Sequence, residues 1–329
     1  MMDTMMIDGY GRKINYLRLS VTDRCNLRCR YCMPEGGIPL LPHGGILRYE
    51  ELLLVARTAV ILGIEKIRVT GGEPLVRKGI LGFLSRLSEI PGLRQLVLTT
   101  NGLLLDEMAE PLKDAGVQRL NISLDSLVPE NFRRITRGGD VSRVLSGIAA
   151  AERAGFPIKL NMVVMRGVND HEVVEFAALT LDKAYTVRFI EFMPSGGEEG
   201  EWRSHVVPGR EILERVAKRY PFEEISRRQL AGPAKEFRIP GAAGTIGVIT
   251  PISGHFCGEC NRIRVTASGM AKGCLFSQEE IDLKPLLRAD GAPGLEEALL
   301  GIVHCKPGKH PLGSDEPGTR PLRMSRVGG

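Results

Sequence analysis

The sequence predicts an α/β fold in which parallel strands form a barrel, and three observations point to it. Short β-rich runs alternate with helical stretches between residues 16 and 192, which is the pattern of parallel strands joined by crossover helices. No Gly-x-Gly-x-x-Gly opens a helix after the first strand, and there is no Walker-type loop, so a doubly wound nucleotide-binding fold is disfavoured. The strands also carry polar residues, which fully buried parallel strands would not.

The elements are expected from hydrophobic periodicity. The expected strands are 16–21, 66–70, 95–100, 119–124, 158–165 and 186–192. The expected helices between them are 48–63, near 79–89, near 105–114, 141–155 and near 170–181. Gly63 and Gly155 close two of these helices, because glycine adopts the left-handed conformation at a helix C-terminus at little cost.

The character of the chain changes after residue 193. We expect a loop at 194–202, a helix near 208–219 and a strand at 244–253. The length of 329 residues suggests about two domains. We therefore divide the chain into a barrel (1–195), a connecting segment (196–239) and a C-terminal extension (240–329) that ends in Gly328 and Gly329.

The bulk composition is that of an ordinary globular protein. It is 43% hydrophobic and 25% charged, with a net charge of +5, which is too mild to indicate a nucleic-acid partner but suits an anionic ligand. A run of about 18 apolar residues, the length of a membrane span, is absent. The first residues, MMDTMMIDGYGRK, lack the apolar core of a secretory signal. We expect a cytoplasmic protein with reduced thiols and no membrane partner.

The polar strand residues share one face. Alternation along a strand puts Asn121, Ser123 and Asp125 opposite the leucines and isoleucine between them. If the apolar face packs on helices, the polar face points into the barrel. This interior would contain four cations, which are Arg18, Arg68, Lys159 and Arg188. Because buried unpaired charges are costly, a polyanion such as a triphosphate is the expected ligand. Alternatively, one or two of these cations pair with Glu191, Asp125 or Glu73 and only support structure.

Residues 22–32, TDRCNLRCRYC, contain a first cysteine group of Cys25, Cys29 and Cys32 with the spacing C-x3-C-x2-C. Disulfides need pairs, and structural zinc usually takes four ligands. Three thiolates on one loop would instead hold a four-iron cubane and leave one iron free for a small molecule. The isolated Cys305 is expected to be an incidental thiol.

A second cysteine group consists of Cys257, Cys260 and Cys274, with the spacing C-x2-C-x13-C. By itself it leaves two interpretations open. One is a zinc site, with His255 as a candidate fourth ligand. The other is a second cubane with a free iron. Arg262 and Arg264 are two residues apart, so on a strand both would point toward the same polar heterocycle or phosphate.

The first cysteine group resembles the signature of the radical S-adenosylmethionine superfamily. Tyr31 before the last cysteine and the segment Gly71-Gly72-Glu73-Pro74 after the second strand also fit it. The resemblance implies a partial (βα)6 TIM-type barrel in which the free iron binds S-adenosylmethionine and one electron cleaves it to a 5′-deoxyadenosyl radical. It implies cofactor contacts from Tyr31, Gly72, Ser123 and Met193.

The whole set of motifs resembles the GTP 3′,8-cyclase family of molybdenum-cofactor biosynthesis. The motifs are YLRLSVTDRCNLRCRYCMP, KIRVTGGEPLVR, LTTNG, NISLDSL, RFIEFMPSG, FCGECNRIRV, GCLF and a terminal MSRVGG, and they span nearly the whole chain in order. The resemblance implies a lyase that forms 3′,8-cyclo-7,8-dihydro-GTP, the first step of the pathway. The radical would take hydrogen from C3′ of the GTP ribose, and C3′ would then bond to C8 of guanine.

The resemblance also implies residue roles. Two 4Fe–4S clusters would be held by the first and second cysteine groups, so the C-terminal extension would carry the second cluster. The implied GTP contacts are Arg18, Arg68, Thr99, Lys159, Arg188, Arg262, Ile263 and Arg264. Gly328 and Gly329 would reach into the active site and be needed for catalysis. The implied partners are a flavodoxin-type electron donor, the cyclic pyranopterin monophosphate synthase that uses the product, and a second copy in a homodimer.

Two other classes of function compete with this one. A peptide-modifying radical enzyme would share the first cysteine group, but it usually has more C-terminal cysteines and no reason for Arg262 and Arg264. A zinc-binding or nucleic-acid-binding protein would contain zinc and present a basic, aromatic-rich surface. Aromatic residues make up only 5% of this chain, which disfavours the last class.

Overall fold

The computed structural model describes residues 6–193, 202–226, 230, 232–310 and 324–327. The strands are β1 (Tyr16–Ser20), β2 (Lys66–Thr70), β3 (Gln95–Thr100), β4 (Arg119–Ser123), β5 (Ile158–Val164), β6 (Thr186–Glu191), β7 (Glu223–Ile225), β8 (Lys235–Arg238), β9 (Thr245–Ile249), β10 (Arg262–Val265), β11 (Met270–Lys272) and β12 (Ile281–Asp282). The α-helices are α1 (Tyr49–Ile61), α2 (Ile80–Ser88), α3 (Leu105–Asp114), α4 (Pro129–Thr136), α5 (Val141–Arg153), α6 (Val173–Asp182), α7 (Gly209–Ala217), α8 (Lys284–Arg288), α9 (Leu295–His304) and α10 (Met324–Val327). Short 3₁₀ turns are η1 (His43–Gly45), η2 (Pro74–Val76), η3 (Asp170–Glu172), η4 (Trp202–His205) and η5 (Cys257–Glu259).

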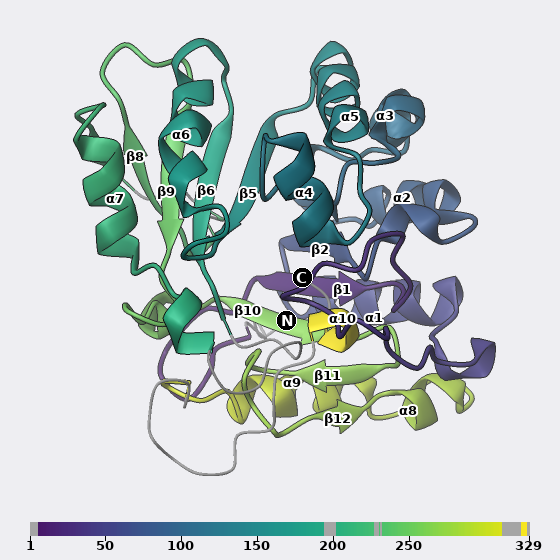
Figure 1. The fold of residues 1–329 in the computed structure, drawn as a ribbon. Helices are drawn as coiled ribbons and strands as arrows, with labels where there is room; N and C mark the ends of the chain where they lie inside the picture. The colour runs from purple at the N-terminus through teal and green to yellow at the C-terminus, as the bar shows by residue number, and fades with distance from the viewer. Residues whose placement is uncertain (1–5, 194–201, 227–229, 231, 311–323, 328–329) are drawn as a thin grey trace.

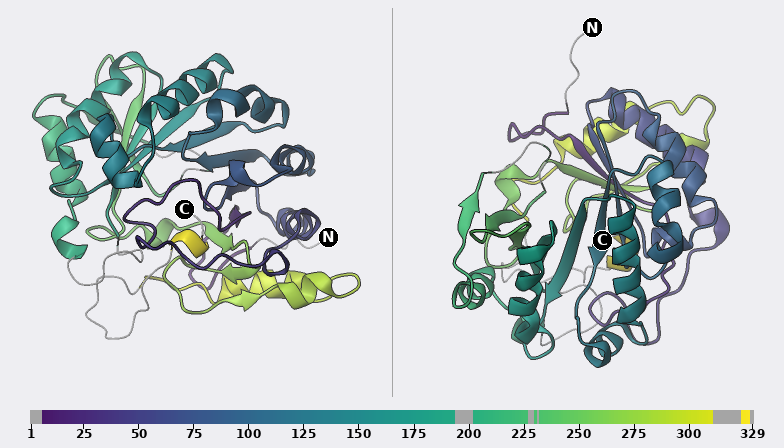
Figure 2. Two further views of the ribbon diagram at one scale, coloured as in Figure 1. Left: turned by 45° about the vertical axis from the view of Figure 1, so that its right-hand side comes forward. Right: turned by 90° about the horizontal axis from the view of Figure 1, so that it is seen from above.

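The expected parallel barrel is present. Strands β1 to β6 lie side by side in chain order and pair in parallel. Helices α1 to α6 cover the outer, convex side of this curved sheet (Figures 1 and 2). The outward strand residues, such as Leu17, Val69 and Leu98, are fully buried in one continuous apolar core. The alternate residues therefore face the interior, as the strand parity predicts.

Two later strands extend both edges of this sheet. Strand β9 pairs in parallel with β6, and β10 pairs in parallel with β1. The connection 250–261 must therefore run from the C-terminal end of one edge to the N-terminal end of the other, along the open side of the barrel. It contains Cys257 and Cys260. Since the first cysteine group follows the C-terminal end of β1, the two cysteine groups lie toward opposite ends of the sheet.

Several expected boundaries needed correction. The strand expected at 244–253 ends at Ile249, because the following residues leave the sheet to form the connection. Helix α4 was not expected, since its sequence PENFRRIT offers only Phe132 and Ile135 to the core. Its end signals are local: Pro129 occupies the first turn, and Arg137 caps it with a φ of 54°. The division at 195 and 239 stays a prediction, although β9 and β10 belong to the barrel's own sheet.

Within the described segments, the helices are too short or too polar to cross a membrane.

Two helical glycines give a matched test of packing. A Cβ at Gly147 in α5 would lie 2.5 Å from the Gly102 carbonyl oxygen and 2.8 Å from Leu105 Cβ, where α5 meets α3. A Cβ at Gly82 in α2 would meet nothing within 4 Å. We expect Gly147→Ala to lower the free energy of unfolding by about 1–3 kcal/mol, and Gly82→Ala to raise it by up to about 1 kcal/mol. Urea unfolding of the metal-free proteins measures both, and equal effects of the two substitutions would contradict the packing argument.

Candidate functional site

A central cavity of about 220 Å³ lies in the barrel interior and is lined by Tyr31 of the first cysteine loop and by all three residues of the second cysteine group. Its sheet-derived lining includes the predicted residues Arg18, Arg68, Thr99, Ser123, Arg188, Arg262 and Arg264. Tyr31 and Met193 line it from the loops, together with Cys257, Cys260 and Cys274. One space therefore touches the first cysteine loop, the cationic strand face and the second cysteine group.

The first cysteine loop is held by the end of α4. Arg28 N–H and Arg30 N–H donate to the carbonyls of Thr136 and Ile135 at 3.1 and 2.9 Å. Cys32 N–H donates to the Cys29 carbonyl at 3.0 Å, which folds the loop back on itself. Helix α4, which periodicity did not predict, is thus what fixes the cysteine loop.

The three thiols of this loop are poor thiolates on their own. Burial, together with Cys25 and Asp125, raises the pKa of Cys32 to about 12. Burial also raises the pKa of Cys29 well above its usual range and raises the pKa of Cys25. Since a thiolate is the ligand form and needs a compensating cation, this donor set fits an iron–sulfur cluster with three cysteine ligands.

The Gly-Gly-Glu-Pro segment after β2 packs directly on the chain that leads into this loop. A Cβ at Gly72 would lie 2.3 Å from the Arg24 carbonyl oxygen, so only glycine fits. Glu73 N–H donates to the same carbonyl at 2.8 Å, and its carboxylate accepts from Asn101 N–H at 2.7 Å and Thr100 Oγ1 at 2.9 Å. Burial raises the pKa of Glu73 to about 7 despite these donors. The segment therefore has a structural role in addition to the predicted cofactor contact.

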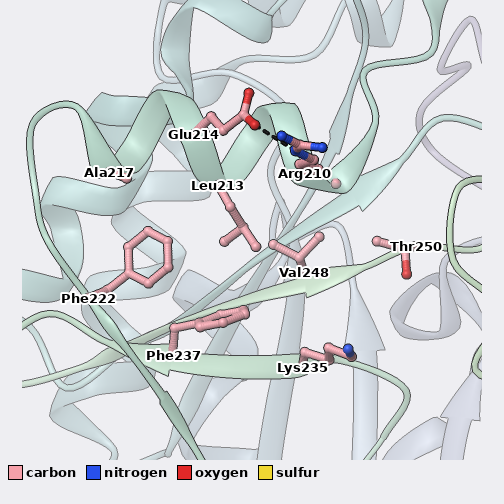
Figure 3. A pocket seen from close by; sticks show the side chains of 10 residues that line it. Arg210, Leu213, Glu214, Ala217, Phe222, Lys235, Phe237, Val248 and Thr250 are labelled. Atoms are coloured by element: carbon pink, nitrogen blue, oxygen red, sulfur yellow. Dashed lines mark hydrogen bonds and ion pairs between the residues drawn. The ribbon is translucent and has the colours of Figure 1, made fainter.

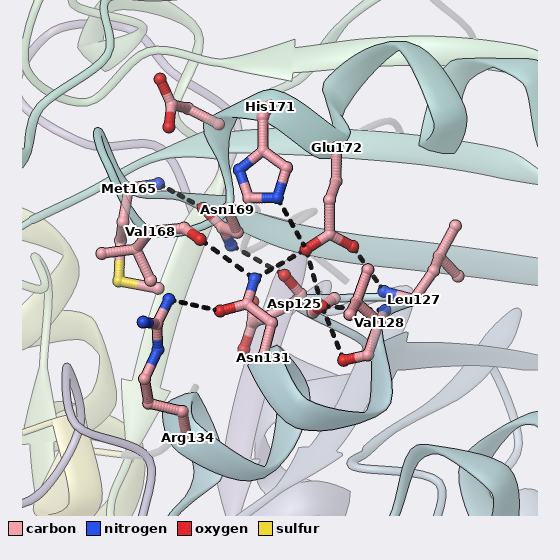
Figure 4. Close-up of polar contacts among 12 residues, drawn as sticks. Asp125, Leu127, Val128, Asn131, Arg134, Met165, Val168, Asn169, His171 and Glu172 are labelled. Atoms are coloured by element: carbon pink, nitrogen blue, oxygen red, sulfur yellow. Dashed lines mark hydrogen bonds and ion pairs between the residues drawn. The ribbon is translucent and has the colours of Figure 1, made fainter.

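Tyr31 is tied to the barrel through Asp125. The Tyr31 hydroxyl donates to Asp125 Oδ2 at 2.8 Å, and Val163 N–H donates to Oδ1 at 2.9 Å. Asn169 Nδ2 in turn donates to the Asp125 carbonyl at 2.8 Å (Figure 4). Burial raises the pKa of Asp125 to about 6. Tyr31, which follows β1, is thus oriented by a buried carboxylate that follows β4.

Glu172 fixes the surroundings of this contact. Its carboxylate accepts hydrogen bonds from the Ser126 hydroxyl, Leu127 N–H and Asn131 Nδ2, each at 2.7 Å (Figure 4). Ser126 and Leu127 lie between β4 and α4 and Asn131 lies in the first turn of α4, whereas Glu172 immediately precedes α6. The network locks the β4–α4 connection, and through it Asp125 and the helix that holds the cysteine loop.

The cations of the barrel interior lie next to one another. The strand register places Arg264, Arg18 and Arg68 side by side on β10, β1 and β2. Burial and the neighbouring guanidinium lower the pKa of Arg18 to about 9, and burial lowers that of Arg68 to about 10. The Nε atoms of Arg18 and Arg68 and the Thr99 hydroxyl are buried without a hydrogen-bond partner among the described residues. These donors fit an anionic ligand.

Lys159 does not line the central cavity. It lies in an adjoining cavity of about 300 Å³ at the N-terminal ends of the strands, and Arg188 lines both cavities. Lys66 and Arg119 also line the adjoining cavity. Sequence reasoning missed these two, although Lys66 has the strand parity of Arg68, and Arg119 that of Asn121. The carboxylate of Glu236 lies 3.1 Å from Lys159 Nζ and 3.6 Å from Arg188 Nη2.

The second cysteine group has cationic surroundings. Arg262 Nη2 and Lys306 Nζ lie 3.5 and 3.3 Å from Cys260 Sγ. Although burial opposes it, these two cations lower the pKa of Cys260 to about 6. By contrast, burial raises the pKa of Cys257. Lys306 was not predicted from the sequence.

Two histidines lie beside Cys257. The ligand atoms of His255, Cys257 and His310 are within 4.8 Å of one another. His255 was the fourth ligand considered for a zinc site, and His310 is a further nitrogen donor that sequence reasoning missed. The geometry by itself keeps both the zinc and the cluster interpretation of this group open.

Arg12 anchors the connection that carries Cys257. Its Nη1 donates to the Cys257 carbonyl at 2.6 Å, and its Nη2 donates to the Pro307 carbonyl at 2.8 Å. Its Nε donates to the buried carboxylate of Asp8. One guanidinium therefore joins the N-terminal segment, the second cysteine group and the segment after α9.

The remaining predicted residues lie elsewhere. The side chain of Ile263 is buried in the apolar core on the far side of β10, so only its backbone is at the cavity side. Cys305 is an exposed free thiol at the end of α9. Gly328 and Gly329 lie outside the described residues. Met324 in α10, four positions before Gly328, lines the central cavity.

Another cavity, of about 380 Å³, lies between α7 and strands β8 and β9 (Figure 3). Its walls are mainly apolar and include Leu213, Phe222, Phe237 and Val248. It contains none of the predicted site residues.

A cysteine loop at the C-terminal end of β1 and a polar barrel interior define a site of the radical S-adenosylmethionine type. Residues 19–180 match the family described as Radical SAM superfamily, and residues 185–312 match Molybdenum Cofactor Synthesis C. The chain is 61% identical over 325 residues to the GTP 3′,8-cyclase of Geobacter sulfurreducens, covering 98% of this chain and 99% of that protein. It is 48% identical over 328 residues to the GTP 3′,8-cyclase of Moorella thermoacetica, covering 98% and 100%. The chain belongs to the GTP 3′,8-cyclase family.

A similar fold occurs in the crystal structure of Streptococcus suis SuiB bound to S-adenosylmethionine. The TM-score is 0.60 at 14% identity, and the match covers 89% of this chain and 69% of SuiB. At this identity the likeness concerns the fold alone. It confirms the α/β barrel predicted from the alternation of strands and helices, in the partial form that the resemblance to the superfamily implied.

The role of Arg12 can be tested through thiol accessibility. Arg12→Met would remove the side-chain donor to the Cys257 and Pro307 carbonyls and the ion-pair partner of Asp8, so the connection should open more often. We expect Cys257 in the metal-free protein to react several-fold faster with a thiol reagent, measured by mass spectrometry, while Cys29 reacts at its original rate. Lys13→Met is the matched control, since Lys13 pairs with Glu65 at the surface, away from the cysteine groups. Unchanged labelling of Cys257 in Arg12→Met would refute the anchor.

Proposed function

We propose that this chain binds GTP and S-adenosylmethionine in the central cavity and converts GTP to 3′,8-cyclo-7,8-dihydro-GTP, the first step of molybdenum-cofactor biosynthesis. The observation that carries the proposal is that one cavity is lined by Tyr31 of the first cysteine loop, by the second cysteine group and by a row of neighbouring arginines. The names and full-length coverage of the relatives support the same reaction. A radical enzyme acting on an uncharged peptide would have no use for such a row of cations.

Each cysteine group has its own part in this proposal. Cys25, Cys29 and Cys32 would hold the cluster that supplies the electron for reductive cleavage of S-adenosylmethionine. Tyr31, Gly72, Ser123 and Met193 would bind and orient that cofactor. Cys257, Cys260 and Cys274 would hold a second 4Fe–4S cluster next to the guanine.

The substrate contacts follow from the two cavities. Arg262 and Arg264, with the backbone of Ile263, would bind the guanine end beside the second cysteine group. Arg18, Arg68 and Thr99 would bind the middle of the molecule. The triphosphate would extend into the adjoining cavity, whose cations include Lys66, Arg119, Lys159 and Arg188. Glu236, which is paired with Lys159 in the structure, would have to exchange this contact for solvent or another donor.

The partners belong to the same proposal. Reduction requires an electron donor, for which a flavodoxin-type protein is proposed. Cyclic pyranopterin monophosphate synthase would use the product, and a homodimer is proposed as the assembly. Gly328 and Gly329 are proposed to reach the substrate, which is consistent with the position of Met324 at the cavity.

The test of the function is an anaerobic assay. Protein reconstituted with iron and sulfide is given S-adenosylmethionine and a strong reductant, and 5′-deoxyadenosine is measured with and without GTP. We expect GTP to raise the formation of 5′-deoxyadenosine strongly. We also expect the cyclised product, which is an isomer of GTP, to appear. A chain without Gly328 and Gly329 should lose the cyclised product. If GTP has no effect on 5′-deoxyadenosine, the substrate assignment is wrong; if the protein contains zinc and no iron, both clusters are wrong.

Two lysines of the adjoining cavity, Lys66 and Lys159, lead us to expect that the protein takes up protons when GTP binds. Burial and nearby arginines lower the pKa of Lys66 to about 6 and of Lys159 to about 7. Phosphate oxygens beside these amines would raise their pKa values, since an opposite charge favours the charged form. Above about pH 6, binding must therefore supply protons that the free protein has lost, and affinity should fall as pH rises from about 6 to 8.

Calorimetry of GTP binding in buffers of different ionisation enthalpy measures this proton uptake. Lys159→Met should reduce the proton uptake and weaken binding at least tenfold. GTP itself also exchanges protons on binding, and this contribution cancels when the uptake of the variant is subtracted from that of the unmodified protein. Lys183→Met is the control, because Lys183 pairs with Glu152 at the surface. If Lys159→Met takes up as many protons as the unmodified protein, Lys159 does not meet the triphosphate.

A further inference from the structure

Lys306 is a buried cation in a segment to which the sequence assigned no role. Lys306 follows α9, and only 3% of its surface is exposed. Its ammonium group lies 3.3 Å from Cys260 Sγ, 3.0 Å from the Arg262 carbonyl oxygen and 2.7 Å from the Gly273 carbonyl oxygen. An ammonium group has three N–H donors, so each of them has an acceptor here.

These acceptors come from two separate pieces of the second cysteine group. Cys260 and Arg262 belong to the connection and strand that follow β9, whereas Gly273 directly precedes Cys274. The amine therefore joins the segment of Cys260 to the segment of Cys274. The same amine thus influences both the relative position of the two segments and the charge beside the Cys260 sulfur.

The position of Lys306 is fixed from both sides. A Cβ at Gly273 would lie 2.7 Å from the Ile302 carbonyl oxygen and 3.3 Å from Lys306 Cα, so the backbones are in close contact. On the other side, Arg12 holds the Pro307 carbonyl. A flexible lysine that is held this way can deliver its charge to one sulfur atom, whereas a lysine on the surface is screened by water.

We propose that Lys306 is a positioning residue for the second cysteine group, where its ammonium hydrogen-bonds to the Cys260 sulfur and raises the reduction potential of the cluster held there. This rests on the proposed presence of that second cluster. Hydrogen bonds to ligand sulfurs and local net charge are the levers by which a protein sets such a potential. A nearby positive charge favours the reduced form, which carries one more negative charge.

The experiment isolates the second cluster in the full-length chain. Cys25, Cys29 and Cys32 are replaced by alanine, the protein is reconstituted anaerobically, and iron and sulfide are counted. The potential is then measured by redox titration followed by electron paramagnetic resonance. Lys306→Met removes the charge and the hydrogen bonds, Lys306→Gln removes the charge and keeps a donor, and Lys306→Arg keeps the charge. Lys309→Met is the control, because it removes the same charge from an exposed position three residues away.

We expect Lys306→Met and Lys306→Gln to lower the reduced-to-oxidised ratio at a fixed potential about tenfold, which is about 59 mV for a one-electron couple. Lys306→Arg should lie closer to the unmodified protein, and Lys309→Met should match it. Potentials that are equal in all four variants overturn the proposal. If Lys306→Met does not assemble a cluster, the comparison of Lys306→Gln with Lys306→Arg decides, and equal potentials again overturn it. A background protein that holds no iron overturns the second cluster itself, which separates that failure from the failure of Lys306.

Discussion

The interior of this barrel is dominated by the repulsion of buried positive charges. Arg264, Arg18 and Arg68 occupy neighbouring positions on three parallel strands, and such strands are only about 4.8 Å apart. The free energy cost of this arrangement appears as lowered pKa values of Arg18 and Arg68. Tyr16 reduces this cost. It lies two residues before Arg18 on the same face of β1, and its ring is 5.4 Å from the Arg68 guanidinium. A bound anion would offset the remaining repulsion, so the same arrangement of charges that lowers stability would favour anionic ligands.

The placement of the two cysteine groups follows from the sheet order. Strands β9 and β10 are consecutive in the chain but lie at opposite edges of the parallel sheet. Their connection must therefore cross the open side of the barrel, and this connection contains Cys257 and Cys260. Glu191 helps to hold the start of this connection, since its carboxylate accepts from Ile252 N–H and Ser253 N–H at 2.9 Å each. A cavity between the two cysteine groups thus arises from the order of the strands.

Sequence reasoning worked where the signal was periodic or local. Alternation along β1 to β6 identified the interior face, and the spacing of Cys25, Cys29 and Cys32 identified the first loop. It failed where the cause is a tertiary contact. Helix α4 has only eight residues, of which Phe132 and Ile135 alone are apolar and packed inward, so its face is too small to recognise in the sequence. The pairing of β10 with β1 joins residues far apart in the chain. Nothing in the sequence around Arg12 or Lys306 distinguishes them from surface cations. Their contacts are with carbonyl groups that only the fold brings to them. Lys66 and Arg119 could have been found, because they follow the same parity as Arg68 and Asn121.

The two cysteine groups have opposite electrostatic surroundings, and this difference suits the different tasks proposed for them. The first group has Asp125 nearby, which raises the pKa values of Cys29 and Cys32 along with burial. A negative environment disfavours adding an electron, so a cluster held there would be a strong reductant once reduced. The second group has Arg262 and Lys306 beside Cys260, which favour negative charge on the sulfur. A cluster held there would keep its electron more readily and would be better suited to binding the substrate than to cleaving the cofactor. Identical ligands can therefore serve reduction at one end of the cavity and recognition at the other, because the neighbouring charges differ in sign.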